Sequence, residues 1–557
     1  MMERDSMHYP QTVFIGGDLY SAGWSSSRRA ALAVRDGAVA AIGSDDDVRA
    51  LAGPSTRVVD LGGRMLVPGF HDAHAHPVSG GVELLQCDLS PARSAAECLD
   101  LVAGYAREHP AEPWIVGGGW AMTHFEGGTP TSAALDTVVA DRPVVLLNRD
   151  HHGAWVNSEA LRRAGIDQST PDPADGRIER DAGGAPSGTL HEGAMALVDA
   201  VRPVIDQEFA YSGFLRAQHE YFRQGIVGWQ DAYVGATFGL DDLLDVYLTA
   251  LDRGTLTARI TAALWWERAG GLAQLDSLVE RRELVRGRRR ADVLDADTVK
   301  IMVDGVAENF TAAMSSPYLD ACGHPTGNSG LTFVAAEQLA EYVTALDAVG
   351  FSVHFHALGD RAVTISLDAL EAARRANGVS AGRHHLAHLQ VVGERDVVRF
   401  AELGATANLQ MLWATVDSQL ADLTFPHLEP ALVERHYPFG DLVRAGTALA
   451  AGSDWPVSTA DPLAAIHVGV NRVDAHEPTA PLGFPEQALD LPTALSAYTA
   501  GSATINGRGA YSGRLRVGYS ADLAVLSQNP FVTGPESIGD TSVLSTWIDG
   551  ASVYESE

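Results

Sequence analysis

Five side chains of metal-ligating types stand at or just after the ends of short apolar runs that lie far apart in the chain. Imidazole nitrogens and carboxylate oxygens are ligands that zinc and similar divalent ions take in proteins. Residues i and i+2 of an extended strand point the same way, so an H-x-H pair can direct two nitrogens at one ion. A single histidine most often has a structural role, but recurrence at the same point of several runs predicts a shared metal site. The five residues are His74, His76, His356, His388 and Asp454.

Lys300 is a sixth candidate, because it interrupts the apolar run 299–303. A charged lysine is costly to bury without a partner, and burial lowers its pKa. A neutral lysine can act as a nucleophile or take up carbon dioxide, which gives an anionic carbamate that can bridge two metal ions. A salt bridge to Asp304 and exposure at a strand end are the alternative explanations.

The segment 67–506 repeats one unit, in which a helical pattern is followed by a glycine and a short apolar run. The clearest helical pattern places apolar residues on one face from Leu240 to Leu251 and stops at Gly254. Such units indicate parallel strands covered by helices, and about eight of them favour a closed (β/α)8 barrel. All strands of such a barrel end at the face that carries the active site, so the candidate ligands should converge there. The strands are expected near Val67, Val227, Ile260, Val299, Val353, His385, Ala407 and Leu449.

The two ends of the chain follow a different pattern from the middle. Residues 1–66 and 507–557 contain short apolar stretches separated by Gly, Asp and Pro turn signals, which predicts one small β-sandwich built from both termini. Residues 79–224 are far more than one barrel crossover needs, and they predict a subdomain inserted over the barrel mouth. Within this insertion, 170–187 is expected to form a surface hairpin or loop. The fold class is therefore α/β.

The composition excludes several kinds of partner. The 557 residues include 40 Lys+Arg and 71 Asp+Glu, a net charge of −31, and the longest basic block is 288–290. Nucleic acids and anionic membrane surfaces require a basic footprint, so we expect a small-molecule substrate. No window approaches the ~18 apolar residues of a membrane span, and residues 1–10 lack a signal-peptide pattern. Three scattered cysteines fit a reducing compartment, so we expect a cytoplasmic protein.

Motifs along nearly the whole chain resemble those of the amidohydrolase superfamily, and more narrowly the amidohydrolase family 3 branch that includes the N-substituted formamide deformylases. They are PGFHDAHAH at 68–76, GGW at 118–120, DHHGAWVNS at 150–158, VKIMVDG at 299–305, HALGDRA at 356–362, HLQ at 388–390, GSDWP at 452–456 and SADL at 520–523.

The resemblance implies a TIM-type metallohydrolase barrel flanked by a β-sandwich, with one or two divalent ions of the zinc type per chain. It also implies a homodimer. The residues that it implies are His74, His76, His356 and His388 as metal ligands, Lys300 as a carboxylated bridging ligand, and Asp454 as ligand and proton shuttle.

Three places depart from the family pattern. His71 and His151 stand where an apolar residue and a glycine are usual, so each could be an extra ligand or a substrate contact, although a supporting position nearby is the favoured interpretation. The segment 306–311, which contains Glu308, has less Gly and Ser than usual. We expect this segment to shape the pocket, so the deformylase substrate does not carry over directly.

A divalent ion held by imidazoles lowers the pKa of bound water towards ~7 and polarises a carbonyl group. The expected reaction is hydrolysis of a C–N bond in an amide or N-substituted formamide, with Asp454 as the proton shuttle and His152 near the oxyanion. Deamination, lactone or carbamate hydrolysis, decarboxylation, and metal binding without turnover are the alternatives. Ordinary packing explains the aromatic candidates about as well as substrate contact. The candidate substrate contacts are Trp120, His151, Trp155, Glu308 and Trp413, with Trp114 and Phe125 also in the insertion.

Overall fold

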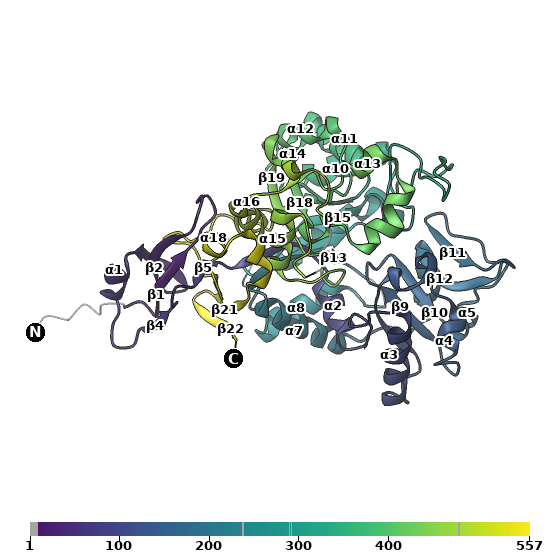
Figure 1. Cartoon of the computed structure of the whole chain (residues 1–557), viewed down its shortest axis with the longest axis horizontal. Helices are drawn as coiled ribbons and strands as arrows, with labels where there is room; N and C mark the ends of the chain where they lie inside the picture. The colour runs from purple at the N-terminus through teal and green to yellow at the C-terminus, as the bar shows by residue number, and fades with distance from the viewer. Residues whose placement is uncertain (1–8, 237–238, 289, 291, 477–479, 557) are drawn as a thin grey trace, which may run out of the picture.

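The computed structural model describes residues 9–556 except 237–238, 289, 291 and 477–479. Residues 1–8 of the predicted amino-terminal segment and Arg289 of the basic block therefore lie outside the described residues. Three sheets follow one another along the long axis of the molecule, with the β domain at one end, the barrel in the centre and the inserted sheet at the other end (Figure 1). Among the described residues, no helix has the length and apolarity that crossing a membrane requires.

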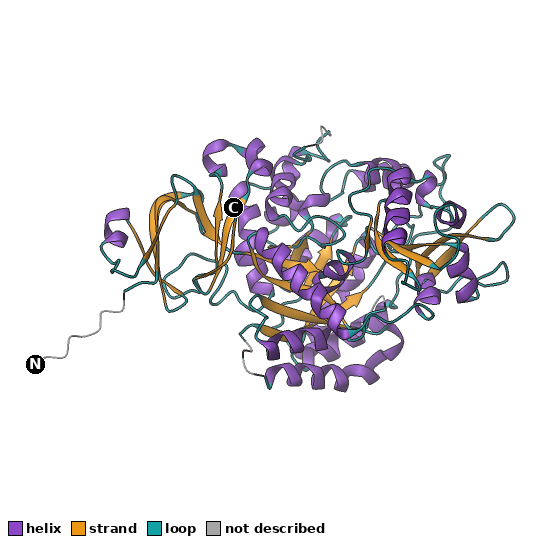
Figure 2. Cartoon of the chain, turned by 90° about the horizontal axis from the view of Figure 1, so that it is seen from below, coloured by secondary structure: helices purple, strands orange, loops and turns teal. Residues whose placement is uncertain are grey.

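The central sheet has eight parallel strands, and the prediction of a (β/α)8 barrel is confirmed. Most of its residues are buried, as expected for strands covered on both faces. Helices surround the sheet (Figure 2). The strands are β6 (Phe70–Ala75), β13 (Ile226–Val234), β14 (Arg259–Trp265), β15 (Leu294–Met302), β16 (Ser352–Ala357), β17 (His385–His388), β18 (Thr406–Leu409) and β19 (Ala448–Ala451).

The predicted sequence of helix, glycine and strand recurs around the barrel. Gly254 ends α8 at φ 70° and Gly404 ends α12 at φ 75°, a left-handed conformation that glycine adopts without strain. Between β18 and β19 the helical segment is divided into two short helices, because Pro438 interrupts it. The helices are α7 (Gln207–Arg223), α8 (Leu243–Arg253), α9 (Leu275–Arg286), α10 (Ala336–Ala348), α11 (Asp360–Asn377), α12 (Glu394–Leu403), α13 (Pro430–Val433), α14 (Phe439–Arg444), α15 (Pro462–Asn471), α16 (Leu491–Ser496) and α17 (Ser502–Ile505).

The prediction that Val67 lies in the first barrel strand is wrong. Val67 belongs to β5 (Met65–Pro68) of the β domain, and the first barrel strand, β6, starts at Phe70. Gly69 marks the change of sheet. Its amide donates to the carbonyl of Asp522 in the β domain, whereas the amide of Phe70 donates to the carbonyl of Gly225, just before β13. A Cβ atom at Gly69 would lie 2.4 Å from Val227, so the close approach requires glycine.

The β domain unites the two termini in one sheet that curves over its own core. The antiparallel pairing of β5 with β20 joins the amino-terminal strands to the carboxy-terminal ones. Phe14 and Trp547, one from each part, meet edge to face in that core. The strands are β1 (Thr12–Leu19), β2 (Arg28–Arg35), β3 (Ala38–Gly43), β4 (Arg57–Asp60), β5, β20 (Leu523–Leu526), β21 (Val543–Ile548) and β22 (Ala551–Glu555).

The inserted sheet has six strands and leaves the barrel after α2 (Pro77–Glu83). Helix α2 packs against α7, which leads back into β13. The segment 170–187 contains β11 and the turn into β12, and these two strands pair antiparallel, so the predicted hairpin is confirmed. The sheet strands are β7 (Cys87–Asp88), β8 (Ile115–Trp120), β9 (Val144–Asn148), β10 (Gly153–Val156), β11 (Gly176–Arg180) and β12 (Pro186–Glu192), with helices α3 (Ala95–Glu108), α4 (Ser132–Asp136), α5 (Ser158–Ala164) and α6 (Ala196–Asp199).

A buried ion pair fastens the β domain to the amino-terminal end of the barrel, and it generates a stability prediction. Arg259, at the start of β14, donates to both carboxylate oxygens of Asp522 at 2.7 and 2.9 Å. Without Asp522, the buried Arg259 keeps only the half-exposed Asp549 as a carboxylate partner, so Asp522→Ala should destabilise the protein by ~3–5 kcal/mol. The measurement is the thermal midpoint of unfolding. Asp549→Asn is the control, because Asp549 contacts the same arginine from a half-exposed position. Equal midpoints for both variants would contradict the prediction.

Candidate active site

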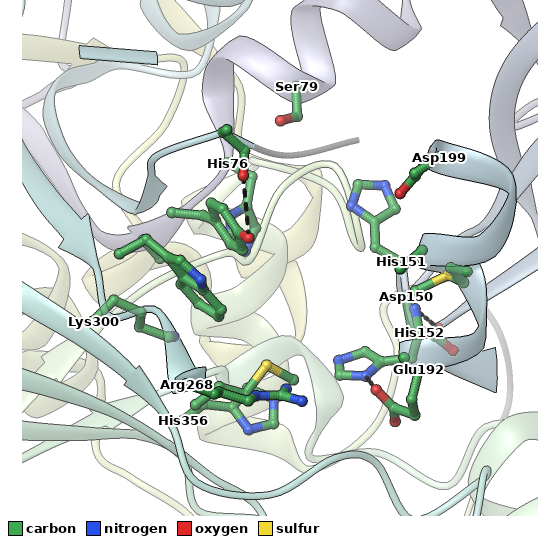
Figure 3. A pocket seen from close by; sticks show the side chains of 18 of the residues that line it. His76, Ser79, Asp150, His151, His152, Glu192, Asp199, Arg268, Lys300 and His356 are labelled. Carbon is green, nitrogen blue, oxygen red and sulfur yellow. Dashed lines mark hydrogen bonds and ion pairs between the residues drawn. The ribbon is translucent and has the colours of Figure 1, made fainter. Parts of the chain in front are cut away.

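A cavity of about 600 Å³ lies between the carboxyl ends of the barrel strands and the inserted domain. Figure 3 shows His76, Lys300 and His356 on one side of it and His151, His152 and Glu192 on the other. The first group comes from the barrel and the second from the insertion. Of the predicted ligands, His74, His76, Lys300, His356, His388 and Asp454 all line this cavity.

Three of the predicted ligands are close enough to share one ion. Atoms of His74, His388 and Asp454 lie within 4.8 Å of one another. Asp454 Oδ1 is 3.2 Å from His74 Nε2 and 3.1 Å from His76 Nε2, and Asp454 Oδ2 is 3.8 Å from His388 Nδ1. Ligands of a tetrahedral ion with bonds of ~2.1 Å lie ~3.4 Å apart, so the spacing fits a divalent metal.

The hydrogen bonding of these atoms gives a second test of the fit. Both ring nitrogens of His388 are buried and have no hydrogen-bond partner among the described residues, and buried Asp454 Oδ1 has beside it the two imidazole nitrogens named above. Buried polar atoms in proteins normally have a partner, and one left without a partner is costly. A cation bound by Asp454 Oδ1 and one ring nitrogen of His388 would give both of these atoms a partner.

The protonation states also suit metal binding. Burial lowers the pKa of His74 to about 3, and burial lowers the pKa of His356 and His388 well below the usual value. Burial alone would raise the pKa of Asp454, but its histidine neighbours, His74 first, hold that pKa well below the ordinary range. The site therefore combines neutral imidazoles with an ionised carboxylate, which are the forms that bind metal.

Lys300 is buried in the barrel beside this group. Burial lowers its pKa to about 7, so a substantial neutral fraction is available near neutral pH. Its Nζ atom lies 3.4 Å from His354 Nε2. The alternative salt bridge to Asp304 does not form, because Asp304 accepts from the amides of Ala313, Leu358 and Gly359. The Asp304 carboxylate lies 3.3 Å from His356 Nδ1, so His356 Nε2 is the nitrogen that remains to bind a metal.

The barrel closes through the residues that carry the ligands. The edge strands β6 and β19 meet where the Asp454 amide bonds to the His74 carbonyl at 2.8 Å. Asp72 joins the same two segments, because its carboxylate accepts from the amides of His74 and Ser453, each at 3.0 Å, and from the Ser453 hydroxyl. Asp72 thus holds the first and the last ligand segments in register.

Several site residues have strained backbones. His388, Asp454, His151 and Glu192 have φ angles of 77°, 57°, 64° and 51°. Non-glycine residues in such conformations cost of order 1–3 kcal/mol each and persist where surrounding contacts hold them, often at functional sites. The amide of His388, for example, is fixed by a 2.6 Å hydrogen bond to Gln410 Oε1.

His152 faces the barrel from the insertion and is held by a carboxylate. Its Nδ1 lies 2.9 Å from Glu192 Oε2, and the Thr311 hydroxyl donates to the other oxygen of Glu192 at 2.7 Å. Burial disfavours the imidazolium, but Glu192 outweighs this effect and raises the pKa of His152 to about 9. His151, also on the cavity wall, lies 2.9 Å from Glu83 Oε1.

The aromatic substrate candidates lie outside the cavity lining. Trp120 and Trp155 are buried in the core of the insertion, where each indole donates to a backbone carbonyl and both pack with Phe125. Trp114 lies in the core on the other side of that sheet. Trp413 stacks on the imidazole of His388, with ring centroids 5.3 Å apart and planes 4° from parallel. None of these four side chains lines the cavity, and internal packing accounts for the positions of the three in the insertion.

Two further candidates lie away from the cavity. Glu308 accepts from the Thr424 hydroxyl at 3.0 Å, and burial raises its pKa to about 7. His71 points away from the ligands, with its Nε2 2.9 Å from the hydroxyl of Ser512 in the β domain. His71 therefore supports the domain contact, and its position excludes the extra-ligand alternative.

Sequence reasoning missed a polar group directly beneath the ligands. His354 on β16 and Gln230 on β13 are fully buried and connect to His74. The sequence contains one signal for His354, because His354-x-His356 repeats the spacing of His74-x-His76 on another strand. Gln230 had no such signal, since its role depends on which strands are neighbours.

Comparison with known proteins agrees with this arrangement. Residues 57–554 match the model of the amidohydrolase family. The chain belongs to the amidohydrolase family. A Bacillus subtilis relative that carries the name amidohydrolase YtcJ is 30% identical over 554 residues, which cover 98% of this chain and 99% of the relative. The N-substituted formamide deformylase of Arthrobacter pascens is 28% identical, with 94% and 95% covered.

Among solved structures, an uncharacterized metal-dependent hydrolase from Pyrococcus horikoshii superposes with a TM-score of 0.72 at 24% identity. The alignment covers 94% of this chain and 99% of that one. This similarity supports the same fold in this member of the amidohydrolase family.

The pair of His152 and Glu192 makes stability depend on pH. The pKa of His152 is about 9 in the folded protein, against 6.5 for an ordinary histidine. The pair therefore stabilises the fold fully below pH 6.5, and this contribution is lost as the pH rises through 9. Glu192→Gln should lower the thermal midpoint most at pH 6 and least above pH 9. Thermal unfolding of the metal-free protein across this range measures the difference.

Asp297→Asn is the control for this measurement, because Asp297 pairs with Arg286 at the surface. A difference between Glu192→Gln and the unmodified protein that stays constant from pH 6 to pH 9.5 would contradict the assignment.

Proposed function

We propose that this protein is a metal-dependent hydrolase that cleaves a C–N bond in an amide or an N-substituted formamide. The observation that carries the proposal is the cluster of His74, His388 and Asp454, in which both ring nitrogens of His388 are buried without a hydrogen-bond partner among the described residues. Membership of the amidohydrolase family supports hydrolysis. The name of the Arthrobacter relative supports the formamide bond, at 28% identity.

The residues that would hold the ion fit a zinc-type metal. Lys300, as a carbamate, would help to hold two ions, and as a free amine it would leave a single ion. A bound divalent ion supplies water activation and polarises the substrate carbonyl. The proposed ligands are His74, His76, His356, His388 and Asp454.

The chain's own groups then move the protons. Asp454 is ionised and faces the ligand cluster, so it can take a proton from the attacking water and return it to the leaving nitrogen. His152 has its Nδ1 occupied by Glu192, which leaves Nε2 as the donor towards negative charge on the substrate oxygen. His151 borders the same space, where it would contact the substrate.

The cavity volume of about 600 Å³ is in the range of small-molecule sites. A small-molecule substrate, a cytoplasmic location and a homodimer complete the proposal. The last two rest on the cysteine content and on the family resemblance.

Metal removal tests the proposal directly. The protein purified without added metal should contain one or two equivalents of zinc or a similar ion. Chelation should abolish hydrolysis of N-formyl and N-acyl arylamines, and metal should restore it. Two equivalents would support a carboxylated Lys300, and one would leave it as a free amine. Protein that neither holds nor takes up metal would refute the proposed function, whereas metal-dependent deamination or lactone cleavage would redirect only the substrate.

Asp454→Asn separates proton transfer from metal binding. The amide keeps an oxygen ligand but cannot accept the proton, so kcat should fall by ~10²–10⁴-fold while most of the metal is retained. Metal content and kcat on the same preparation are the measurements. Unchanged kcat at full metal occupancy would show that another group moves the proton.

A further inference from the structure

His354 lies beneath the proposed metal site and has no part in the function proposed above. It is fully buried on β16, two residues before His356. Its Nε2 atom lies 2.8 Å from His74 Nδ1, and its Nδ1 atom lies 2.7 Å from Gln230 Oε1. A buried imidazole placed between a ligand and an amide can control which nitrogen of the ligand carries the proton.

The orientation of the Gln230 amide follows from a backbone carbonyl. The Asp72 carbonyl can only accept, so the atom of Asn506 that lies 3.1 Å from it is the donor Nδ2. Asn506 therefore turns its Oδ1 to Gln230, whose Nε2 lies 3.2 Å away. Gln230 Oε1 then points at His354 Nδ1, 2.7 Å away. His385 Nε2 lies 3.0 Å from the same oxygen and its Nδ1 lies 2.9 Å from the Arg383 carbonyl, so a neutral His385 donates to one of these two oxygens only.

The proton positions between Gln230 and the proposed ligand follow in order. Gln230 Oε1 accepts, so His354 Nδ1 is the donor. A neutral imidazole with its proton on Nδ1 can only accept at Nε2, so His74 Nδ1 donates to it. His74 Nε2 is then left with a lone pair, and this nitrogen is the one 3.2 Å from Asp454 Oδ1.

We propose that His354, oriented by Gln230, is a positioning residue that fixes His74 in the tautomer whose Nε2 binds the metal. This inference rests on the proposed function, because it requires a metal at His74. Lys300 Nζ lies 3.4 Å from the same nitrogen of His354, whose single lone pair accepts from His74 at the shorter distance of 2.8 Å. Partners behind metal-bound histidines typically change metal affinity by ~10–100-fold when they are removed.

The test measures zinc affinity of the metal-stripped protein by competition with a chromogenic chelator. His354→Leu removes the acceptor, and Gln230→Met removes the group that orients it, so each should weaken zinc binding by ~10–100-fold. His354→Gln can place an amide oxygen near the position of Nε2, so it should recover most of the affinity lost in His354→Leu. A role in packing alone would not give this recovery.

Thr298→Val is the matched control. Thr298 is fully buried on β15, two residues before Lys300, and its hydroxyl has no hydrogen-bond partner among the described residues. This variant should bind zinc as the unmodified protein does, and the thermal midpoints of all metal-free variants show which ones fold. If His354→Leu does not fold, the zinc affinity of Gln230→Met tests the proposal.

The outcomes separate the two proposals. Unmodified protein that binds no zinc would overturn the proposed function, and the positioning role with it. Zinc binding by the unmodified protein with equal affinity in Gln230→Met and His354→Leu would overturn only the positioning role. Equally weak binding by His354→Gln and His354→Leu would also overturn it, because the acceptor would then not be the property that matters.

Discussion

The active-site end of this barrel depends on hydrogen-bond partners for its buried imidazoles, because water cannot supply them there. A neutral imidazole has one donor and one acceptor, and leaving either unpaired in a protein interior is costly. The fold pairs one nitrogen of several histidines with a fixed partner and turns the other towards the cavity. His74 is backed by His354, His356 by Asp304, and His152 by Glu192. The same contacts that lower the cost of burial therefore also decide which atoms remain for chemistry.

Barrel closure and site assembly use the same residues. Asp72 holds the amides of His74 and Ser453, and the Asp454 amide bonds back to β6. The left-handed backbones of Asp454 and His388 are costly alone, so they need this surrounding frame. A barrel that failed to close between β6 and β19 would separate His74 from Asp454. The metal-binding geometry is thus a consequence of closing the sheet, which explains why candidate ligands so far apart in sequence meet.

The sequence predicted the barrel, the shared β domain and the convergence of the ligands because these depend on local patterns. Helix-glycine-strand units are visible in one dimension, and so is the H-x-H spacing. The change of sheet at Gly69 was missed, because the apolar run at Val67 satisfies either sheet equally well. The roles of Gln230 and Asp304 were missed for a related reason. Each acts across neighbouring strands, and a single sequence contains no signal for such a contact. For Trp120 and Trp155 the sequence left both interpretations open, because an aromatic side chain suits a core as well as a pocket.

The inserted domain explains why family membership fixes the chemistry more firmly than the substrate. The barrel supplies the ligand cluster, whereas His151, His152 and Glu192 bring the opposite wall of the cavity from the insertion. Polar contacts tie that wall to the barrel loops: Asn309 donates to the carbonyl of His152, and Arg268 pairs with Asp175 at 2.8 Å. Because these contacts set the distance between the two walls, changes in the insertion or its loops would alter which substrates fit while leaving the ligands in place. Substrate choice can therefore diverge among relatives that share the same metal-binding barrel.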